Sequence, residues 1–112
     1  MARGGNGALS LSFLVYPSED NPGRVVAHCL ELDIVAVEST KRKALLLLKE
    51  LVQDQFEAAN ADGTLEDIFQ PAPSKYWRML YEGEPYHPPQ SVEKRHIKGV
   101  SLKRVEYAEA TA

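Results

Sequence analysis

The chain has 112 residues, of which 44% are hydrophobic and 26% are charged, and its formal net charge is −3. This length allows one domain with a real core and is too short for two ordinary domains. No apolar run approaches the roughly 18 residues that a membrane helix needs. The acidic balance argues against a dedicated nucleic-acid binder. One cysteine allows no internal disulfide, which agrees with the cytoplasmic location that we expect.

The N-terminal part of the chain predicts a disordered arm followed by a β-hairpin. Residues 1–8 contain three glycines and little to bury, so we expect no fixed structure there. Residues 9–16 alternate between apolar side chains and serines, which is typical of a half-buried strand. The run of turn-forming residues at 17–23 then leads to a second strand at 24–29.

A third strand and a long helix complete the predicted core, residues 9–63. Residues 34–38 are rich in β-branched side chains and have strand length. Ser39 or Thr40 can cap a helix from about Lys41 to about Ala61, and Gly63 can end it. The sequence therefore predicts an α+β fold, with a three- to four-stranded, mainly antiparallel sheet and one long helix packed on one face. The face of that helix expected to pack on the sheet carries Ala44, Leu45, Leu48, Leu51, Val52, Gln55, Phe56 and Ala59.

Residues 64–112 form a proline-rich extension, which we assign to the same domain. Five of the seven prolines lie here and exclude long helices. Ser74 can cap a short helix that carries three aromatic residues, which could line a pocket or an interface. A strand is predicted at 97–107, with either a bulge or a division into two short strands near Lys103 and Arg104, where the alternation slips phase. The three aromatic residues are Tyr76, Trp77 and Tyr81.

No catalytic or metal-binding set is predicted. His28 and Cys29 are neighbours, but adjacent strand residues point to opposite faces, so this histidine cannot activate this thiol. The three histidines are scattered, and no pair of Cys or His has the spacing of metal ligands. No glycine-rich phosphate loop follows a strand. We therefore expect no cofactor.

Four carboxylates leave one enzymatic alternative open. Glu31 and Asp33 flank the turn between two strands, and Glu50 and Asp54 are one helical turn apart. Such a set could bind two metal ions in a nuclease. However, the first pair fits a turn, and the second pair fits the exposed face of an amphipathic helix. A metal-dependent nuclease is thus the least favoured interpretation.

Two basic clusters are candidates for binding. Lys41, Arg42 and Lys43 occupy the first turn of the long helix, where cations oppose the macrodipole at about 0.3–1 kcal/mol each. They indicate either an exposed patch that contacts a partner or a cost that the fold tolerates. The second cluster could touch nucleic acid or, more simply, protect an edge strand from aggregation. It consists of Lys94, Arg95, His96, Lys98, Lys103 and Arg104.

The run Gly23–Thr40, with Ala44-Leu45 and Leu48-Lys49-Glu50-Leu51 after it, resembles the HicB-like antitoxin family. Its order of strand, "ELD" turn, strand, threonine cap and amphipathic helix is similar to the order in that family. The resemblance covers roughly residues 9–63. It implies a partial RNase H-like β-β-β-α-β fold without catalytic residues.

The resemblance also implies a homo-oligomer, a dimer or a tetramer, that binds and occludes a small basic toxin. The candidate partner-binding residues are Glu31, Asp33, Lys41, Arg42 and Lys43. Residues 64–112 do not resemble a helix-turn-helix or a ribbon-helix-helix, so binding to nucleic acid is not expected. They are more similar to the extensions of solitary members of the family. The alternative function is therefore a solitary regulatory or small-ligand-binding module whose pocket contains the three aromatic residues.

Overall fold

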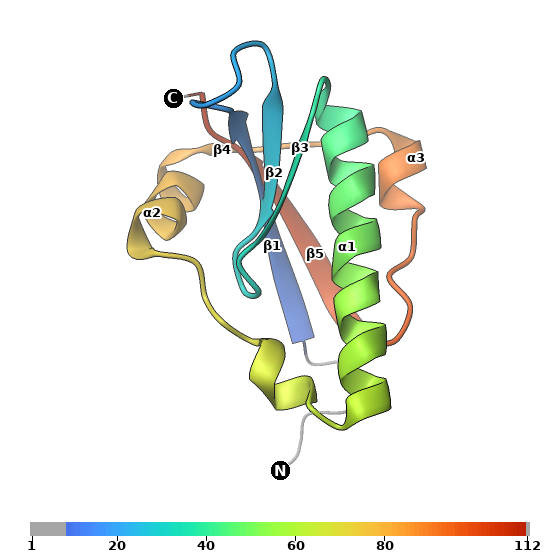
Figure 1. The fold of residues 1–112 in the computed structure, drawn as a ribbon. Helices are drawn as coiled ribbons and strands as arrows, with labels where there is room; N and C mark the ends of the chain where they lie inside the picture. Colours follow the sequence, from blue (N-terminus) through green and yellow to red (C-terminus); the bar gives the residue numbers. More distant parts are fainter. Residues whose placement is uncertain (1–8, 112) are drawn as a thin grey trace.

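The computed structural model describes residues 9–111, and the predicted arm at 1–8 lies outside the described residues. Three strands come first, followed by a long helix, and a last strand returns to the middle of the sheet (Figure 1). None of the helices in the described range is long and apolar enough to cross a membrane. The elements are β1 (Leu9–Pro17), β2 (Val25–Cys29), β3 (Ile34–Glu38), α1 (Lys41–Asp62), the 3₁₀ helix η1 (Leu65–Ile68), α2 (Ser74–Glu82), β4 (Glu84–Pro85), α3 (Gln90–Glu93) and β5 (Leu102–Glu109).

The sheet has five strands in the order β3-β2-β1-β5-β4. The pairs β1–β2, β2–β3 and β4–β5 are antiparallel, whereas β5 is parallel to β1. The predicted α+β class and the β-β-β-α-β order are therefore confirmed, because three antiparallel strands precede the long helix and a parallel strand follows beside the first. The sheet has one strand more than predicted, since the two residues of β4 extend it beyond β5.

Several elements form where the local sequence predicted them. The predicted hairpin forms, with Phe13 opposite Cys29 in the β1–β2 ladder. The last strand starts later than predicted, at Leu102, but it contains the predicted bulge. Leu9 lies opposite Leu102 and Ser10 lies opposite Arg104, so one extra residue, Lys103, is accommodated between them.

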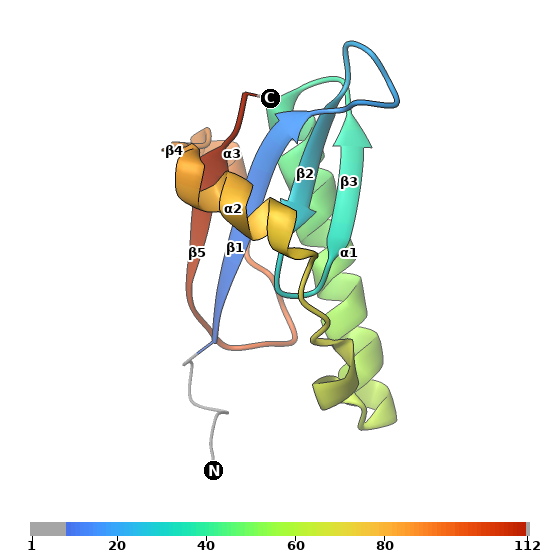
Figure 2. The same ribbon diagram turned by 90° about the vertical axis from the view of Figure 1, so that its left-hand side faces the viewer.

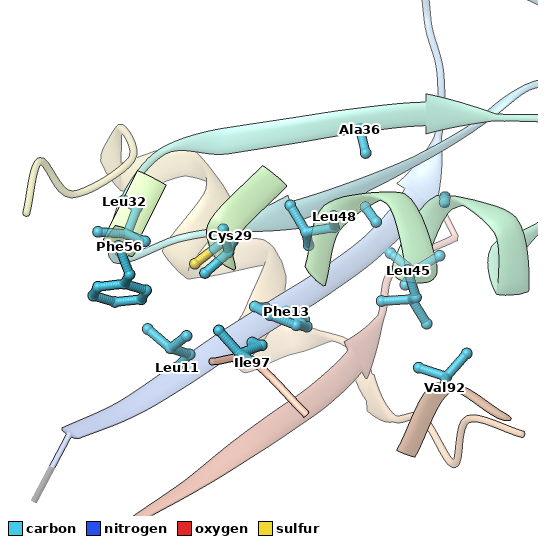
Figure 3. Close-up of a cluster of buried hydrophobic side chains, with 14 residues drawn as sticks. Leu11, Phe13, Cys29, Leu32, Ala36, Leu45, Leu48, Phe56, Val92 and Ile97 are labelled. Carbon is cyan, nitrogen blue, oxygen red and sulfur yellow. The ribbon is translucent and has the colours of Figure 1, made fainter. Parts of the chain in front are cut away.

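Helix α1 covers one face of the sheet with its apolar stripe. Thr40 is its N-cap, and the threonine hydroxyl accepts a hydrogen bond from the Lys43 backbone N–H at 3.1 Å. Gly63 ends the helix with φ of 69°, a left-handed conformation that glycine adopts without strain. Figure 3 shows the side chains of α1 meeting those of β1, β2 and β3 in the main core. The largest fully buried members of this core are Leu11, Phe13, Val15, Leu45, Leu48, Val52, Phe56 and Val92.

The opposite face of the sheet is also covered, so the prediction of a half-buried first strand is wrong. Every residue from Leu11 to Val15 is buried. Leu14 and Leu30 are fully buried on the second face, where they contact a smaller core under α2. Figure 2 shows α2 lying across this face, on the opposite side of the sheet from α1.

Helix α2 begins without the predicted serine cap and ends before Gly83. Its N-cap position is Pro73, without a side-chain hydrogen bond, and Ser74 is its first helical residue, so the predicted serine cap is wrong. The fixed φ of proline already sets the helical entry. At the other end, a Cβ on Gly83 would lie 2.6 Å from the Glu109 carbonyl oxygen. Glycine at this position lets β4 approach β5.

Candidate functional site

A chain of polar side chains lies on the second face of the sheet. His28 projects from β2 and is 2% exposed. Its Nε2 lies 2.7 Å from Asp33 Oδ1, and its Nδ1 lies 2.9 Å from the Tyr16 hydroxyl. Because the carboxylate can only accept, Nε2 donates to it, and Nδ1 then accepts from the tyrosine. The Tyr76 ring from α2 packs edge-on against the imidazole, at 4.6 Å between centroids, and stacks on Tyr16 at 5.8 Å.

Within this row of polar side chains, burial favours the neutral forms of His28 and Tyr16. Burial lowers the pKa of His28, although the hydrogen bond and the charge of Asp33 act to raise it. Burial and the neighbouring Tyr76 raise the pKa of Tyr16. Asp33, whose side chain is 44% exposed, is the charged end of the chain. The backbone of Asp33 has a φ of 53°, in the left-handed region. The hydrogen bond from His28 therefore holds an unusual turn in place.

The neighbouring thiol lies on the other face, as the strand alternation predicted. Cys29 is fully buried in the main core under α1. Burial and the charge of Glu31 raise the pKa of this thiol to about 12. At neutral pH the side chain is therefore a thiol rather than a nucleophilic thiolate.

Glu31 and Asp33 both make contacts within the chain. The Glu31 carboxylate accepts hydrogen bonds from the Ser12 backbone N–H at 2.7 Å and from the Ser12 hydroxyl at 2.8 Å. These bonds fix the end of the β1–β2 hairpin, as the His28 bond fixes the β2–β3 turn. The two carboxylates predicted to bind a partner thus stabilise the turn between these strands.

The structure does not bring Lys41, Arg42 and Lys43 together as one patch. Lys41 forms an ion pair with Glu109 of β5, and its Nζ lies 5.5 Å from the centroid of the Tyr86 ring. Arg42 donates from Nε to the Ser91 hydroxyl at 3.0 Å. Lys43 is exposed. Two of the three cations therefore connect α1 to distant segments, which offsets part of their unfavourable position at the helix N-terminus.

Two of the three predicted aromatic residues fill the second core. Tyr76 contacts Tyr16 and His28, and Trp77 donates from Nε1 to the Ala72 carbonyl at 3.1 Å. Tyr81 is 85% exposed. A surface hollow of about 520 Å³ lies near α2, and its lining includes none of the three. It is lined by Met79, Glu82, Gly83, Glu84, Glu109, Ala110 and Thr111.

The sequence analysis missed a buried lysine on α1. Lys49 is 4% exposed, and its Nζ donates to the Val92 carbonyl at 2.7 Å and to the Arg95 carbonyl at 3.1 Å. The ammonium also lies 5.4 Å from the centroid of the Tyr107 ring. Burial lowers the pKa of Lys49 to about 8. One sequence signal points to it, because Lys49 lies four residues after Leu45 on the buried stripe.

The four carboxylates considered for a nuclease do not converge. Glu31 and Asp33 hold the β2–β3 turn, while Glu50 and Asp54 lie on the exposed side of α1. Within residues 9–111, no group of three or more His, Cys, Asp or Glu side chains is placed to hold a metal ion.

An acidic stripe runs along α1 and into η1. Glu50, Asp54 and Glu57 lie within about 60° of one another on the outer side of α1, and Asp62, Glu66 and Asp67 follow at the end of α1 and in η1; all six are exposed. In the described part of the chain, none of these six forms an ion pair. The first turn of α1 has no acidic residue and its last turn has no basic one, so the charges oppose the macrodipole at both ends. Helix stability alone does not account for this distribution.

No family model, no curated protein and no solved structure matches the chain. The interpretation of its function therefore rests on the resemblance in sequence and on the surfaces described above.

The pH dependence of stability tests the burial of His28 between Tyr16 and Asp33. Because the pKa of His28 is lower in the folded state, the unfolded chain binds more protons below about pH 6.5. The free energy of unfolding should fall as the pH drops from 7.5 to 5.5, and His28→Gln should reduce that fall. Urea unfolding at the two pH values measures both. His87→Gln, at an exposed position, is the control. If both variants show the same fall in the free energy of unfolding between pH 7.5 and 5.5, the lowered pKa of buried His28 is contradicted.

Titration of Lys49 tests the buried cation. Its ¹⁵Nζ resonance should titrate near pH 8, well below the ordinary lysine pKa of about 10.4. Lys49→Ala leaves two buried carbonyls without their donor and should lower the free energy of unfolding by about 1–3 kcal/mol. Lys43→Ala, in the same helix at an exposed position, should change it by less than about 0.5 kcal/mol. A Lys49 that titrates with the exposed lysines would contradict the structure.

Proposed function

We propose that this chain is a non-catalytic protein-binding domain of the HicB-like antitoxin type, which binds and occludes a small basic protein. The observation that carries the proposal is the acidic stripe on α1 and η1. Its six exposed carboxylates make no ion pairs within residues 9–111, and Glu50, Asp54 and Glu57 share the outer side of α1. An acidic surface of this kind accelerates encounter with a basic partner and favours its orientation.

The placement of the polar residues supports a binding role rather than chemistry. Among the described residues, the buried polar side chains are Ser12, His28 and Lys49, and each is engaged by hydrogen bonds within the fold. The exposed charges lie instead on the outside of α1, on an element that the main core holds rigidly. A rigid helix can present its carboxylates to a partner without a large loss of conformational entropy.

The ligand-binding alternative has less support. Tyr76 and Trp77 pack into the second core, and their polar atoms or ring edges contact neighbouring elements. Tyr81 lies outside that core and is exposed. An aromatic ligand pocket would require these side chains to leave their packing positions.

The test is inhibition of a small basic ribonuclease encoded beside the gene. The wild-type protein should form a complex with it and suppress RNA cleavage. Reversing three charges of the stripe with Glu50→Lys, Asp54→Lys and Glu57→Lys should lower the association rate at low salt roughly tenfold or more. Surface plasmon resonance measures the rate, and an RNA cleavage assay measures the inhibition.

The matched control reverses three exposed carboxylates elsewhere, with Glu19→Lys, Asp20→Lys and Glu84→Lys. It changes the net charge by the same amount and should retain most of the inhibition. If both triple variants bind equally, the stripe is not the contact surface. If the wild-type protein leaves every such ribonuclease fully active, the antitoxin-type function is wrong.

A further inference from the structure

Strand β3 is an edge of the sheet without the usual protection of an edge. It pairs with β2 over five residues without a register shift. Two of its side chains are exposed and apolar: Val35 is 48% exposed and Val37 is 37% exposed. Its five residues include no lysine, no proline and no bulge, and their single charged residue, Glu38, is the last of the strand. Edge strands of monomeric proteins usually carry such features, because a bare edge pairs with another strand.

The hydrogen bonds between β1, β2 and β3 determine which backbone groups of β3 face outward. The Leu30 N–H donates to the Ser12 carbonyl, and the Ser18 N–H donates to the Arg24 carbonyl, so even-numbered residues of β2 bond to β1. Odd-numbered residues of β2 therefore bond to β3, and their partners include Ala36. The N–H and C=O groups of Val35 and Val37 point away from the sheet.

Helix α1 presents an apolar flank on the same side as this edge. Arg42, Gln53 and Asn60 all reach the segment 91–99, so one flank of α1 faces α3. Leu47 and Leu51 are about 140° and 180° away around the helix axis at 100° per residue. Both are half-buried and lie on the flank toward β3.

The position of α1 over the sheet fits a second copy. The helix packs on both β2 and β3, so its axis lies about half a strand spacing inside β3. A two-fold axis that pairs two β3 strands lies half a strand spacing outside β3. With strands about 4.8 Å apart, the two α1 axes would be about 9.5 Å apart. Packed helices lie about 8–10 Å apart, so sheet pairing and helix packing are satisfied together.

We propose that β3 is the interface of a homodimer, in which two copies pair antiparallel around a two-fold axis at Ala36. Val35 of each copy then lies opposite Val37 of the other, and the outward backbone groups of these residues form hydrogen bonds. The pairing makes one sheet of ten strands. Ala36 lies two residues before the end of β3, and about four residues of a helix span the same length. Because α1 runs back along β3 from the end of that strand, the two-fold axis passes near residues 46 and 47 of α1. Leu47 and Leu51 fill the contact between the helices.

The occupant is a second copy because the surface is complementary to itself. A β-branched residue faces another across the strands, and a leucine flank faces its own copy. Glu50 and Glu57 of the acidic stripe lie on the outer side of α1, away from Leu47 and Leu51, and remain exposed. This inference does not rest on the proposed function, and a dimer that inhibits no ribonuclease would still satisfy it.

The mass of the full chain in solution is the first test. Analytical ultracentrifugation should give about 25 kDa, twice the chain mass of 12.5 kDa. Val35→Lys with Val37→Lys places charges on the paired edge and should give a monomer with an unchanged circular dichroism spectrum. Leu65→Lys with Tyr81→Lys, also at exposed positions, should remain dimeric. A monomeric wild type, or a β3 variant that folds and stays dimeric, overturns the proposal.

A disulfide across the axis is the second test, and it does not require disruption of the fold. Facing Cα atoms of helices about 9.5 Å apart are about 5 Å apart, within the range that a disulfide spans. Leu47→Cys should therefore form a covalent dimer under mild oxidation, which non-reducing electrophoresis detects. Gln53→Cys, on the flank toward α3, should not. Cys29 is fully buried and serves as an unreactive background. Equal cross-linking of the two variants, or none with Leu47→Cys, overturns the proposal.

Discussion

The fold depends on burying both faces of β1. This strand lies between β2 and β5 in the middle of the sheet, and its residues from Leu11 to Val15 are buried without interruption. A strand buried on both faces needs a covering layer on each side. Helix α1 supplies one layer, and α2 supplies the other (Figures 1 and 2). The proline-rich segment after Gly63 is consequently part of the core of the domain and supplies β5, α2 and Val92.

The polar residues near the cores follow from the same constraint. Burial of two faces leaves turns and helix ends that need hydrogen-bond partners inside the fold. His28 and Glu31 hold the β2–β3 connection, which Glu31 also joins to Ser12 of β1, and Lys49 donates to the Val92 and Arg95 carbonyls in and just after α3. Histidine, glutamate and lysine are residue types that also occur in catalytic sites, and this is the only likeness of these three residues to such a site. Their contacts account for them as supports of the fold.

Local patterns predicted the parts of the fold that local interactions determine. The apolar period of α1, the Thr40 cap and the left-handed Gly63 are all read within a few residues, and all are present. The bulge at Lys103 was also predictable, because the alternation of side chains slips at that point. The hairpin of β1 and β2 followed from its turn-forming loop.

The second face was not predictable from local patterns. Leu14 lies between two residues that face α1, and the alternation alone cannot show that α2 will cover it. The partners of the basic turn are similarly distant, because Lys41 pairs with Glu109 and Arg42 with Ser91. Of the candidate partner-binding residues, Glu31 and Asp33 lie in the β2–β3 turn, and their hydrogen bonds to Ser12 and His28 give them a structural role. The acidic stripe and the β3 edge could not be predicted from the sequence, because only the tertiary structure shows which charged side chains lack ion pairs and which strand lacks a neighbour.

The most direct test of this account removes residues 64–112 and follows the remaining chain by thermal unfolding and amide hydrogen exchange. Without β5 and α2, the strand β1 loses one neighbour and the cover of one face. The account predicts that residues 1–63 show no cooperative unfolding transition and no protected amides in β1, whereas the full chain shows both. A cooperative transition with protected β1 amides in the shortened chain would contradict it, because the first 63 residues would then form a stable domain without the cover of the second face.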